Sequence, residues 1–133
     1  MKFKYKRFSP AFIRPIIPIK IGYGGITVEQ GVLVDSGADI CLFDARIGKL
    51  IGVPVEQGEP RVFRGATAAP QTYYMHPITI EVGGWKYKIK AGFVPDFAPR
   101  YGIVGQVGFF NFFTIKFDYR KEEIEIKPVE ERK

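Results

Sequence analysis

The chain has 133 residues, with 15 glycines, 10 prolines and a net charge of +6 at pH 7. This length fits one domain with its own core, and no apolar stretch is long enough to span a membrane. The single cysteine, Cys41, excludes an internal disulfide, and one cysteine with one histidine leaves no Cys/His zinc site. We therefore expect no metal and no other cofactor. The lone thiol and an N-terminus without a signal peptide predict a cytoplasmic protein with no membrane partner.

The N-terminus is expected to be a basic arm over residues 1–12, ahead of a domain over residues 13–133. Six of the 20 basic residues precede the first acid, Glu29, and the other 14 balance the 14 acids. Residues 2–8 alternate basic and aromatic side chains, a pattern that can stack on and neutralise a nucleic acid. Nothing downstream extends this patch, so an edge strand or a solvated arm is favoured over a nucleic-acid partner.

Short strands joined by turns are predicted along most of the chain, because β-branched and aromatic residues recur between glycines and prolines. Pro18 marks the first strand of the domain as an edge strand or a bulged one, and Gly83-Gly84 suits the two-residue turn of the clearest hairpin. The expected strands cover residues 16–21, 26–34, 73–82, 85–94, 103–104, 114–119 and 123–127.

Two short helices are predicted among these strands. Asp44 can cap a helix over residues 45–51, which Gly52 would end, and an aromatic-rich stretch of helical length covers residues 106–112. The fold class is therefore all-β (mainly β), a compact closed barrel with one or two short helices.

The segment Gly31–Asp39 reads Gly-Val-Leu-Val-Asp-Ser-Gly-Ala-Asp and carries most of the functional information. An apolar run, residues 32–34, leads directly into Asp35 and a tight turn made by Ser36 and Gly37. A carboxylate at the edge of a core is costly unless it is hydrogen-bonded or shares its proton with a second acid. An ordinary Asx turn after a strand is the structural alternative, because Asp, Ser and Gly are common in turns.

A second segment, residues 101–113, favours the functional interpretation. Its short apolar strand Ile103-Val104 ends in Gly105 and runs into the aromatic-rich stretch. Together the two segments resemble the retropepsin-like aspartic proteases, and most closely their small prokaryotic members. In that family an apolar strand ends in Asp-(Thr/Ser)-Gly-Ala-Asp, and a later apolar-apolar-Gly segment precedes a helix. The resemblance covers about residues 13–127 and implies a closed acid-protease barrel of the single-lobe, retroviral type.

The resemblance also implies a role for each residue of the motif. Asp35 would be the catalytic acid/base, Ser36 would hydrogen-bond across a dimer axis, and Gly37 would let a backbone amide approach the carboxylate. Ala38 would leave room for an extended peptide. Asp39 would line the cleft and contact the substrate backbone, with capping of the loop as its structural alternative.

A small-residue segment lies between the two motifs. Gly65, Ala66, Thr67 and Ala68 form a tip between the apolar arms of residues 61–71. Such a tip is narrow and mobile, as a hairpin that covers a substrate must be, and its backbone amides could bind substrate carbonyls. The alternative is an ordinary surface loop.

Peptide hydrolysis by carboxylates needs two acids that share one proton, because like charges a few ångströms apart cannot both ionise. Only one of the five aspartates, Asp35, has an apolar strand before it and Ser-Gly after it. One such site per chain implies a two-fold homodimer in which each subunit supplies Asp35.

One position departs from the family pattern. Many retroviral members have an arginine directly after the glycine of the second motif, where it anchors the dimer through an acid of the catalytic loop. Here the position is Gln106, which can hydrogen-bond but supplies no charge. This departure leaves open whether the dimer is weak or is held by other contacts.

Two other catalytic pairs are conceivable but less favoured. Ser36 or Cys41 could each act as a nucleophile with the only histidine, His76, as base. Cys41 lies in an apolar run, where a small buried residue is the simpler interpretation, and His76 lies in a strand before Pro77.

The sequence thus predicts an aspartic endopeptidase that cleaves peptide or protein substrates as a homodimer. The alternative is a retropepsin-fold dimerisation or peptide-binding module without significant proteolysis, since a fold does not guarantee an activity.

Overall fold

The computed structural model of the chain describes residues 1–64 and 69–129, which form twelve strands and two short helices. The helices are α1 (Ala45–Leu50) and the 3-10 helix η1 (Val55–Gln57). No helix in these ranges has the length and apolar character needed to cross a membrane. The strands are β1 (Lys2–Lys4), β2 (Lys6–Ser9), β3 (Phe12–Arg14), β4 (Ile16–Tyr23), β5 (Ile26–Val34), β6 (Leu42–Asp44), β7 (Glu59–Phe63), β8 (Gln71–Val82), β9 (Trp85–Val94), β10 (Gly102–Val104), β11 (Phe113–Asp118) and β12 (Glu123–Pro128).

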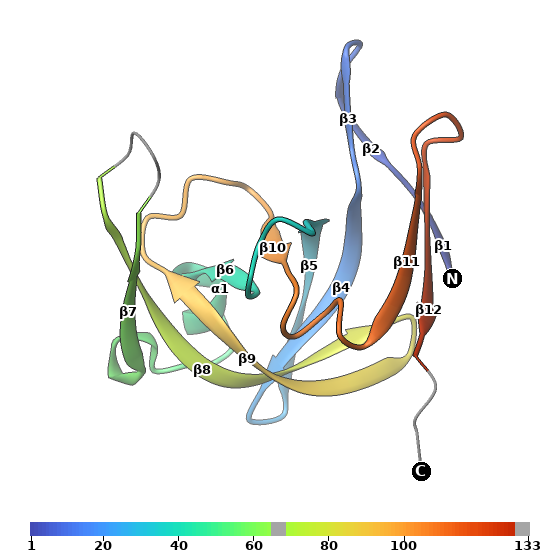
Figure 1. Cartoon of the computed structure of the whole chain (residues 1–133). Coiled ribbons are helices and arrows are strands. Elements are labelled where there is room, and N and C mark those ends of the chain that lie inside the picture. The colour runs from blue at the N-terminus through green and yellow to red at the C-terminus, as the bar shows by residue number, and fades with distance from the viewer. Residues whose placement is uncertain (65–68, 130–133) are drawn as a thin grey trace.

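Six of the strands close into a barrel (Figure 1). Their order is β4-β5-β10-β6-β9-β8, β8 pairs again with β4, and β7 extends the sheet beyond β8. Strand β10 runs parallel to β5, and β6 runs parallel to β9, whereas the other neighbours are antiparallel. The predicted all-β closed barrel with short helices is confirmed.

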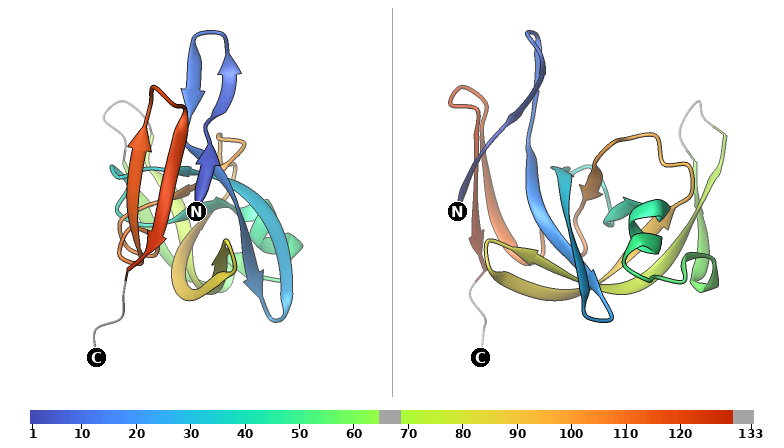
Figure 2. Two further views of the ribbon diagram at one scale, coloured as in Figure 1. Left: turned by 90° about the vertical axis from the view of Figure 1, so that its right-hand side faces the viewer. Right: turned by 180° about the vertical axis from the view of Figure 1, so that it is seen from behind.

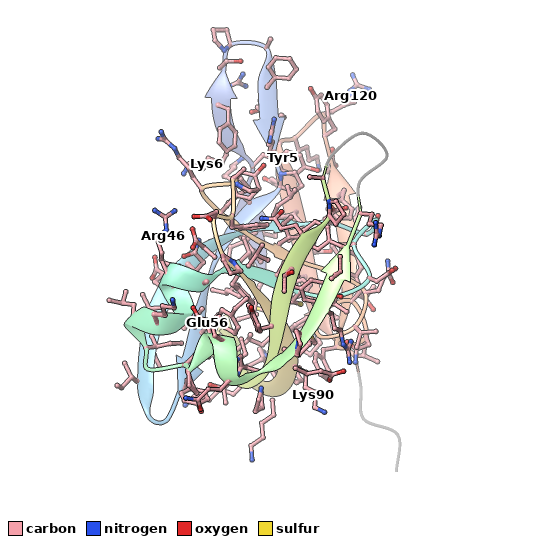
Figure 3. All side chains as sticks on the ribbon, turned by 90° about the vertical axis from the view of Figure 1, so that its left-hand side faces the viewer. Tyr5, Lys6, Arg46, Glu56, Lys90 and Arg120 are labelled. Atoms are coloured by element: carbon pink, nitrogen blue, oxygen red, sulfur yellow. The ribbon has the colours of Figure 1, made fainter. Side chains whose placement is uncertain are left out.

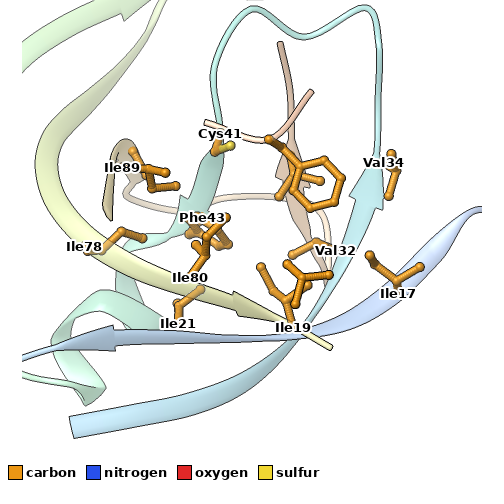
Figure 4. Close-up of a cluster of buried hydrophobic side chains, with 14 of the residues drawn as sticks. Ile17, Ile19, Ile21, Val32, Val34, Cys41, Phe43, Ile78, Ile80 and Ile89 are labelled. Atoms are coloured by element: carbon orange, nitrogen blue, oxygen red, sulfur yellow. The ribbon is translucent and has the colours of Figure 1, made fainter. Parts of the chain in front are cut away.

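Alternation of inward and outward side chains builds the core of the barrel. On β4 the side chains of Ile17, Ile19 and Ile21 are buried, whereas Pro18 and Lys20 are exposed. Figure 4 shows the three isoleucines among the other buried side chains of the barrel. Pairing of β4 with β8 begins only at Lys20, so Pro18 lies where that edge of β4 is open, as the sequence predicts.

Two smaller sheets stand beside the barrel (Figure 2). Strand β12 pairs with both β1 and β11, and β2 and β3 form a separate hairpin. Lys2 and Lys4 are exposed while Phe3 between them is half-buried, so the start of the basic arm is an edge strand. The boundary between an arm over residues 1–12 and a domain over residues 13–133 stays a prediction.

Local sequence signals locate α1 and the Gly83-Gly84 turn correctly. The backbone N–H of Arg46 donates to Asp44 Oδ1 at 2.9 Å, so Asp44 is the N-cap, and α1 ends one residue earlier than expected. Gly83 and Gly84 have φ angles of 55° and 89°, as a tight hairpin turn with two left-handed residues requires.

The predicted helix over residues 106–112 is wrong. This segment consists of turns and one β-bridge, from Val107 to Ile40, and the N–H of Phe110 donates to the carbonyl of Gly105, five residues back, at 3.1 Å. Gly108 has a φ of 107°, which lies outside the helical region. Phe109 is fully buried in the barrel, so packing of the aromatic side chains decides the backbone path here.

Candidate active site

Asp35 lies where strand β5 leaves the barrel. The two preceding core residues of the strand, Val32 and Val34, are buried, and Asp35 itself is half-buried. The N–H of Asp35 donates to the carbonyl oxygen of Val104 on β10 at 3.0 Å, which continues the pairing of β5 with β10 by one residue. The barrel therefore fixes the backbone of Asp35 and leaves its carboxylate partly open to solvent.

The turn after Asp35 is closed by hydrogen bonds to Asp35 itself. The N–H of Gly37 donates to Asp35 Oδ1 at 2.8 Å, and the N–H of Ala38 donates to the Asp35 carbonyl at 3.2 Å. The first bond is that of an Asx turn and the second is that of a β-turn, so the turn interpretation of Asp35 describes the local geometry correctly. Within residues 1–64 and 69–129, no group donates to Asp35 Oδ2, which leaves that oxygen available for chemistry.

The segment after β10 lies directly against the Asp35 loop. A methyl group at Gly105 would lie 2.6 Å from the carbonyl oxygen of Ile40 and still closer to that of Ala38. Only glycine allows this approach of two backbones. The end of β10 therefore packs directly against the loop, and Gly105 makes the closest approach between the two segments.

Gln106 forms hydrogen bonds to the Asp35 loop of its own chain. Its backbone N–H donates to the carbonyl of Ala38 at 2.8 Å, and its side-chain Nε2 donates to the carbonyl of Ser36 at 2.6 Å. The next residue, Val107, donates its N–H to the carbonyl of Asp39 at 2.9 Å. Three carbonyl groups of the loop, those of Ser36, Ala38 and Asp39, are thus bound by two residues, and an uncharged amide is sufficient for this role.

The structure brings the residues of the first motif together on one loop. Ser36, Gly37 and Asp39 are exposed there, and Ala38 is half-buried. The other predicted substrate-binding residues, Gly65 to Ala68, lie outside the described residues. Strands β7 and β8 pair up to Phe63 and Gln71 on either side of them, as the predicted hairpin requires. The substrate-binding roles of these residues stay predictions.

One contact near the site has no signal in the sequence. Arg14 Nη1 donates to the hydroxyl of Tyr101 at 2.7 Å, and Tyr101 directly precedes β10. These residues are 87 positions apart, and no local pattern links them. Only the tertiary structure places the end of β3 beside the strand that supports Asp35.

The geometry does not favour the two alternative catalytic pairs. Cys41 is fully buried, with Sγ 3.8 Å from the carbonyl oxygen of Val107, and burial raises the pKa of its thiol to about 11. His76 is also buried, and its Nε2 lies at hydrogen-bond distance, 2.8 Å, from the carbonyl of Val55. Ser36, by contrast, is exposed on the Asp35 loop. Because Val55 belongs to η1, the contact of His76 with its carbonyl joins β8 to η1.

Cys41 is expected to resist thiol reagents in the folded protein. With a pKa of about 11, only roughly 0.1 % of the thiol is ionised at pH 8, because the thiolate fraction falls tenfold for each pH unit below the pKa. Alkylation by iodoacetamide, followed by mass spectrometry, should be at least about 100-fold slower than in the urea-unfolded chain. Equal rates in the two states would show that Cys41 is accessible and would reopen the nucleophile hypothesis.

No protein-family model matches the chain, and no curated protein matches it. Solved structures do match. A retropepsin-like aspartic protease from Rickettsia conorii has a TM-score of 0.64 at 15% identity, covering 93% of this chain and 97% of that one. The retroviral protease-like domain of Ddi1 from Leishmania major has a TM-score of 0.62 at 17% identity, covering 87% and 90%. The EIAV protease complexed with the inhibitor HBY-793 has a TM-score of 0.51 at 20% identity, covering 74% and 88%.

These similarities define the class of the fold. The chain has the retropepsin-like fold of aspartic proteases, and the resemblance read from the two motifs is confirmed at that level. The matches cover 74% to 93% of this chain, so the similarity is one of the whole fold and not of a single element.

Proposed function

We propose that the protein is an aspartic endopeptidase of the retropepsin type that acts as a homodimer. The observation that carries this proposal is the Asp35 loop. The end of β5, where Val32 and Val34 are buried, delivers one half-buried carboxylate to the end of the barrel, and the Gly105–Val107 segment fixes the loop around it. The fold similarity supports the class of reaction, while the activity itself depends on this site.

Catalysis requires a second carboxylate, which the partner's copy of Asp35 would supply. The two carboxylates would share one proton, because two like charges a few ångströms apart cannot both be ionised. The ionised carboxylate removes a proton from water as the water oxygen attacks the scissile carbonyl carbon. The protonated carboxylate polarises that carbonyl by donating to its oxygen.

The substrate is expected to be an extended peptide lying between the Asp35 loop and the β7–β8 hairpin. Ala38, with its small side chain, would leave room for the peptide backbone beside the carboxylates, and the exposed Asp39 would contact that backbone. The tip of the hairpin, residues 65–68, would cover the peptide and offer backbone amides to its carbonyl oxygens. No cofactor takes part in this scheme.

A second candidate function is a dimerisation or peptide-binding module without significant turnover. It is motivated by Gln106, whose side chain is bound to Ser36 of its own loop and carries no charge toward a partner. Incubating the purified protein with an unfolded protein at mildly acidic to neutral pH separates the two functions. Fragments whose formation is suppressed by a transition-state-mimicking aspartic protease inhibitor support the endopeptidase. Intact substrate under conditions where the protein is dimeric favours the binding module.

Activity per chain is expected to depend on both protein concentration and pH. A shared site forms only in the dimer. At protein concentrations below the dissociation constant, the total cleavage rate should therefore fall with roughly the square of protein concentration, and the activity per chain in proportion to that concentration. In pH the rate should follow a bell, because one carboxylate must be ionised and the other protonated. Initial rates of peptide cleavage from micromolar to low nanomolar protein, over a series of buffers, measure both effects. Activity of a demonstrably monomeric form would contradict the shared-aspartate mechanism.

A further inference from the structure

The N-terminal hairpin, made of β2, the turn at Pro10-Ala11 and β3, exposes two large aromatic side chains. Phe8 is 46% exposed and Phe12 is 63% exposed. Figures 1 and 2 show the hairpin projecting from the barrel, with its tip beyond the loop that joins β5 to β6. Aromatic side chains concentrated on a projecting element indicate a surface that binds something.

The hairpin is held in place at its base. Arg14 bonds to the hydroxyl of Tyr101, and Arg7 Nη2 lies 2.9 Å from Glu122 Oε1, in the turn between β11 and β12. The ring of Phe8 meets Tyr101 edge-on, with centroids 6.1 Å apart, and lies under the Arg14 guanidinium at 5.1 Å. Contacts to both sides thus orient the hairpin, so its exposed aromatic residues are presented in a defined position.

The turn between β11 and β12 supports the hairpin from the same end of the molecule. The N–H of Tyr5 donates to the carbonyl of Glu122 at 2.8 Å, and its ring meets Tyr119 edge-on at 6.4 Å between centroids. In Figure 3, Tyr5, Lys6 and Arg120 all lie toward the end from which the hairpin projects. The N-terminal hairpin and the β11–β12 hairpin therefore lie at the same end of the molecule.

The proposed reaction requires a second copy of the chain at this end. A stable interface buries roughly 800 Å² on each partner, contributed by about 20–30 residues. The exposed loop from Ser36 to Asp39 is far too small to supply that area. The side chain of Gln106 is engaged within its own chain, so the interface needs another anchor. The N-terminal hairpin projects beyond this loop, so it is placed to contact a copy whose Asp35 approaches from that end of the molecule.

We infer that the N-terminal hairpin packs Phe8 and Phe12 against a second copy of this chain and thereby holds the two Asp35 loops together. This inference rests on the proposed homodimeric function. Phe12 is the central contact, because it is the more exposed of the two and has no aromatic partner among the described residues. Phe8 and Arg14 set the position of the hairpin through Tyr101.

The test compares the dimer dissociation constants of four proteins by sedimentation over a concentration series. They are the wild type, Phe12→Ser, the double variant Phe8→Ser/Phe12→Ser, and a control, Leu50→Ser. Leu50 is 67% exposed at the end of α1 and matches Phe12 in exposure. We expect the dissociation constant to rise roughly tenfold for Phe12→Ser and 100-fold for the double variant, with the control unchanged. Thermal unfolding of all four checks the fold, and Phe12→Ser keeps the test valid if the double variant is unstable.

The possible outcomes separate this inference from the proposed function. Equal dissociation constants for the wild type and both hairpin variants would overturn the inference and leave the protease intact. A wild type that stays monomeric at every concentration would overturn the inference together with the shared-aspartate mechanism. Cleavage that survives Asp35→Asn would refute the shared-aspartate mechanism and leave the hairpin contact untouched. Binding of the wild type, but not of Phe12→Ser, to phosphatidylserine-containing vesicles with equal dimer affinity would assign the hairpin to a lipid surface and overturn the inference.

Discussion

Replacing Asp35 by asparagine is expected to reduce peptide cleavage by roughly 1,000-fold or more. The amide cannot take a proton from water, and a dimer of the variant has no carboxylate at position 35 in either subunit. The amide oxygen can still accept the hydrogen bond that Gly37 donates to Asp35 Oδ1, so the turn keeps its shape. Initial rates of peptide cleavage at a protein concentration where the wild type is dimeric measure this loss.

A matched control is Asp118→Asn, the same substitution at another loop-capping aspartate. Asp118 Oδ1 accepts the N–H of Lys121 at 3.1 Å in the turn between β11 and β12, and an asparagine retains that acceptor. The control should keep wild-type activity, and both variants should keep the wild-type melting temperature. Undiminished cleavage by purified Asp35→Asn would falsify the assignment of Asp35 as the catalytic residue.

Replacing Gly105 by alanine is expected to damage both the fold and the site. The added methyl group would overlap the carbonyl oxygens of Ala38 and Ile40, which belong to backbone and cannot rotate away. We expect the free energy of unfolding to fall by about 1–3 kcal/mol, as for other overpacked positions. Because these carbonyls belong to the loop of Asp35, cleavage should fall by roughly 100-fold even where the variant is folded. Urea unfolding and initial rates measure the two effects separately.

Gly31→Ala is the control for this experiment because it adds the same methyl group on β5, the strand that carries Asp35. At Gly31 the nearest atom is Ile16 Cγ2 at 3.4 Å, an ordinary van der Waals contact. Its effect should stay within about 0.5 kcal/mol, with activity close to the wild type. A Gly105→Ala variant as stable and active as Gly31→Ala would show that the loop is free to move away from residue 105. The loop would then not be rigidly held by this segment.

Much of the fold could be predicted from local patterns. β-Branched residues between glycines and prolines located β4, and the apolar run before Asp35 located the end of β5. The Gly83-Gly84 turn and the Asp44 cap follow from backbone geometry that few residues satisfy, so their sequence signals are reliable. The helix predicted over residues 106–112 is wrong because the length of the segment suits a short helix, whereas burial of Phe109 in the barrel fixes a series of turns.

The sequence by itself determined the two segments that form the candidate site, residues 31–39 and 101–113. Each contains a strand that ends in a turn, and the conformation of such a strand and turn depends on residues that are adjacent in the chain. Only the tertiary structure decided how they meet. Parallel pairing of β10 with β5 brings Gly105 and Gln106, about 70 positions after Asp35, into contact with its loop. The same holds for Arg14 and Tyr101, which join the N-terminal hairpin to β10. Contacts between residues so far apart depend on the closure of the barrel, and no local propensity encodes them.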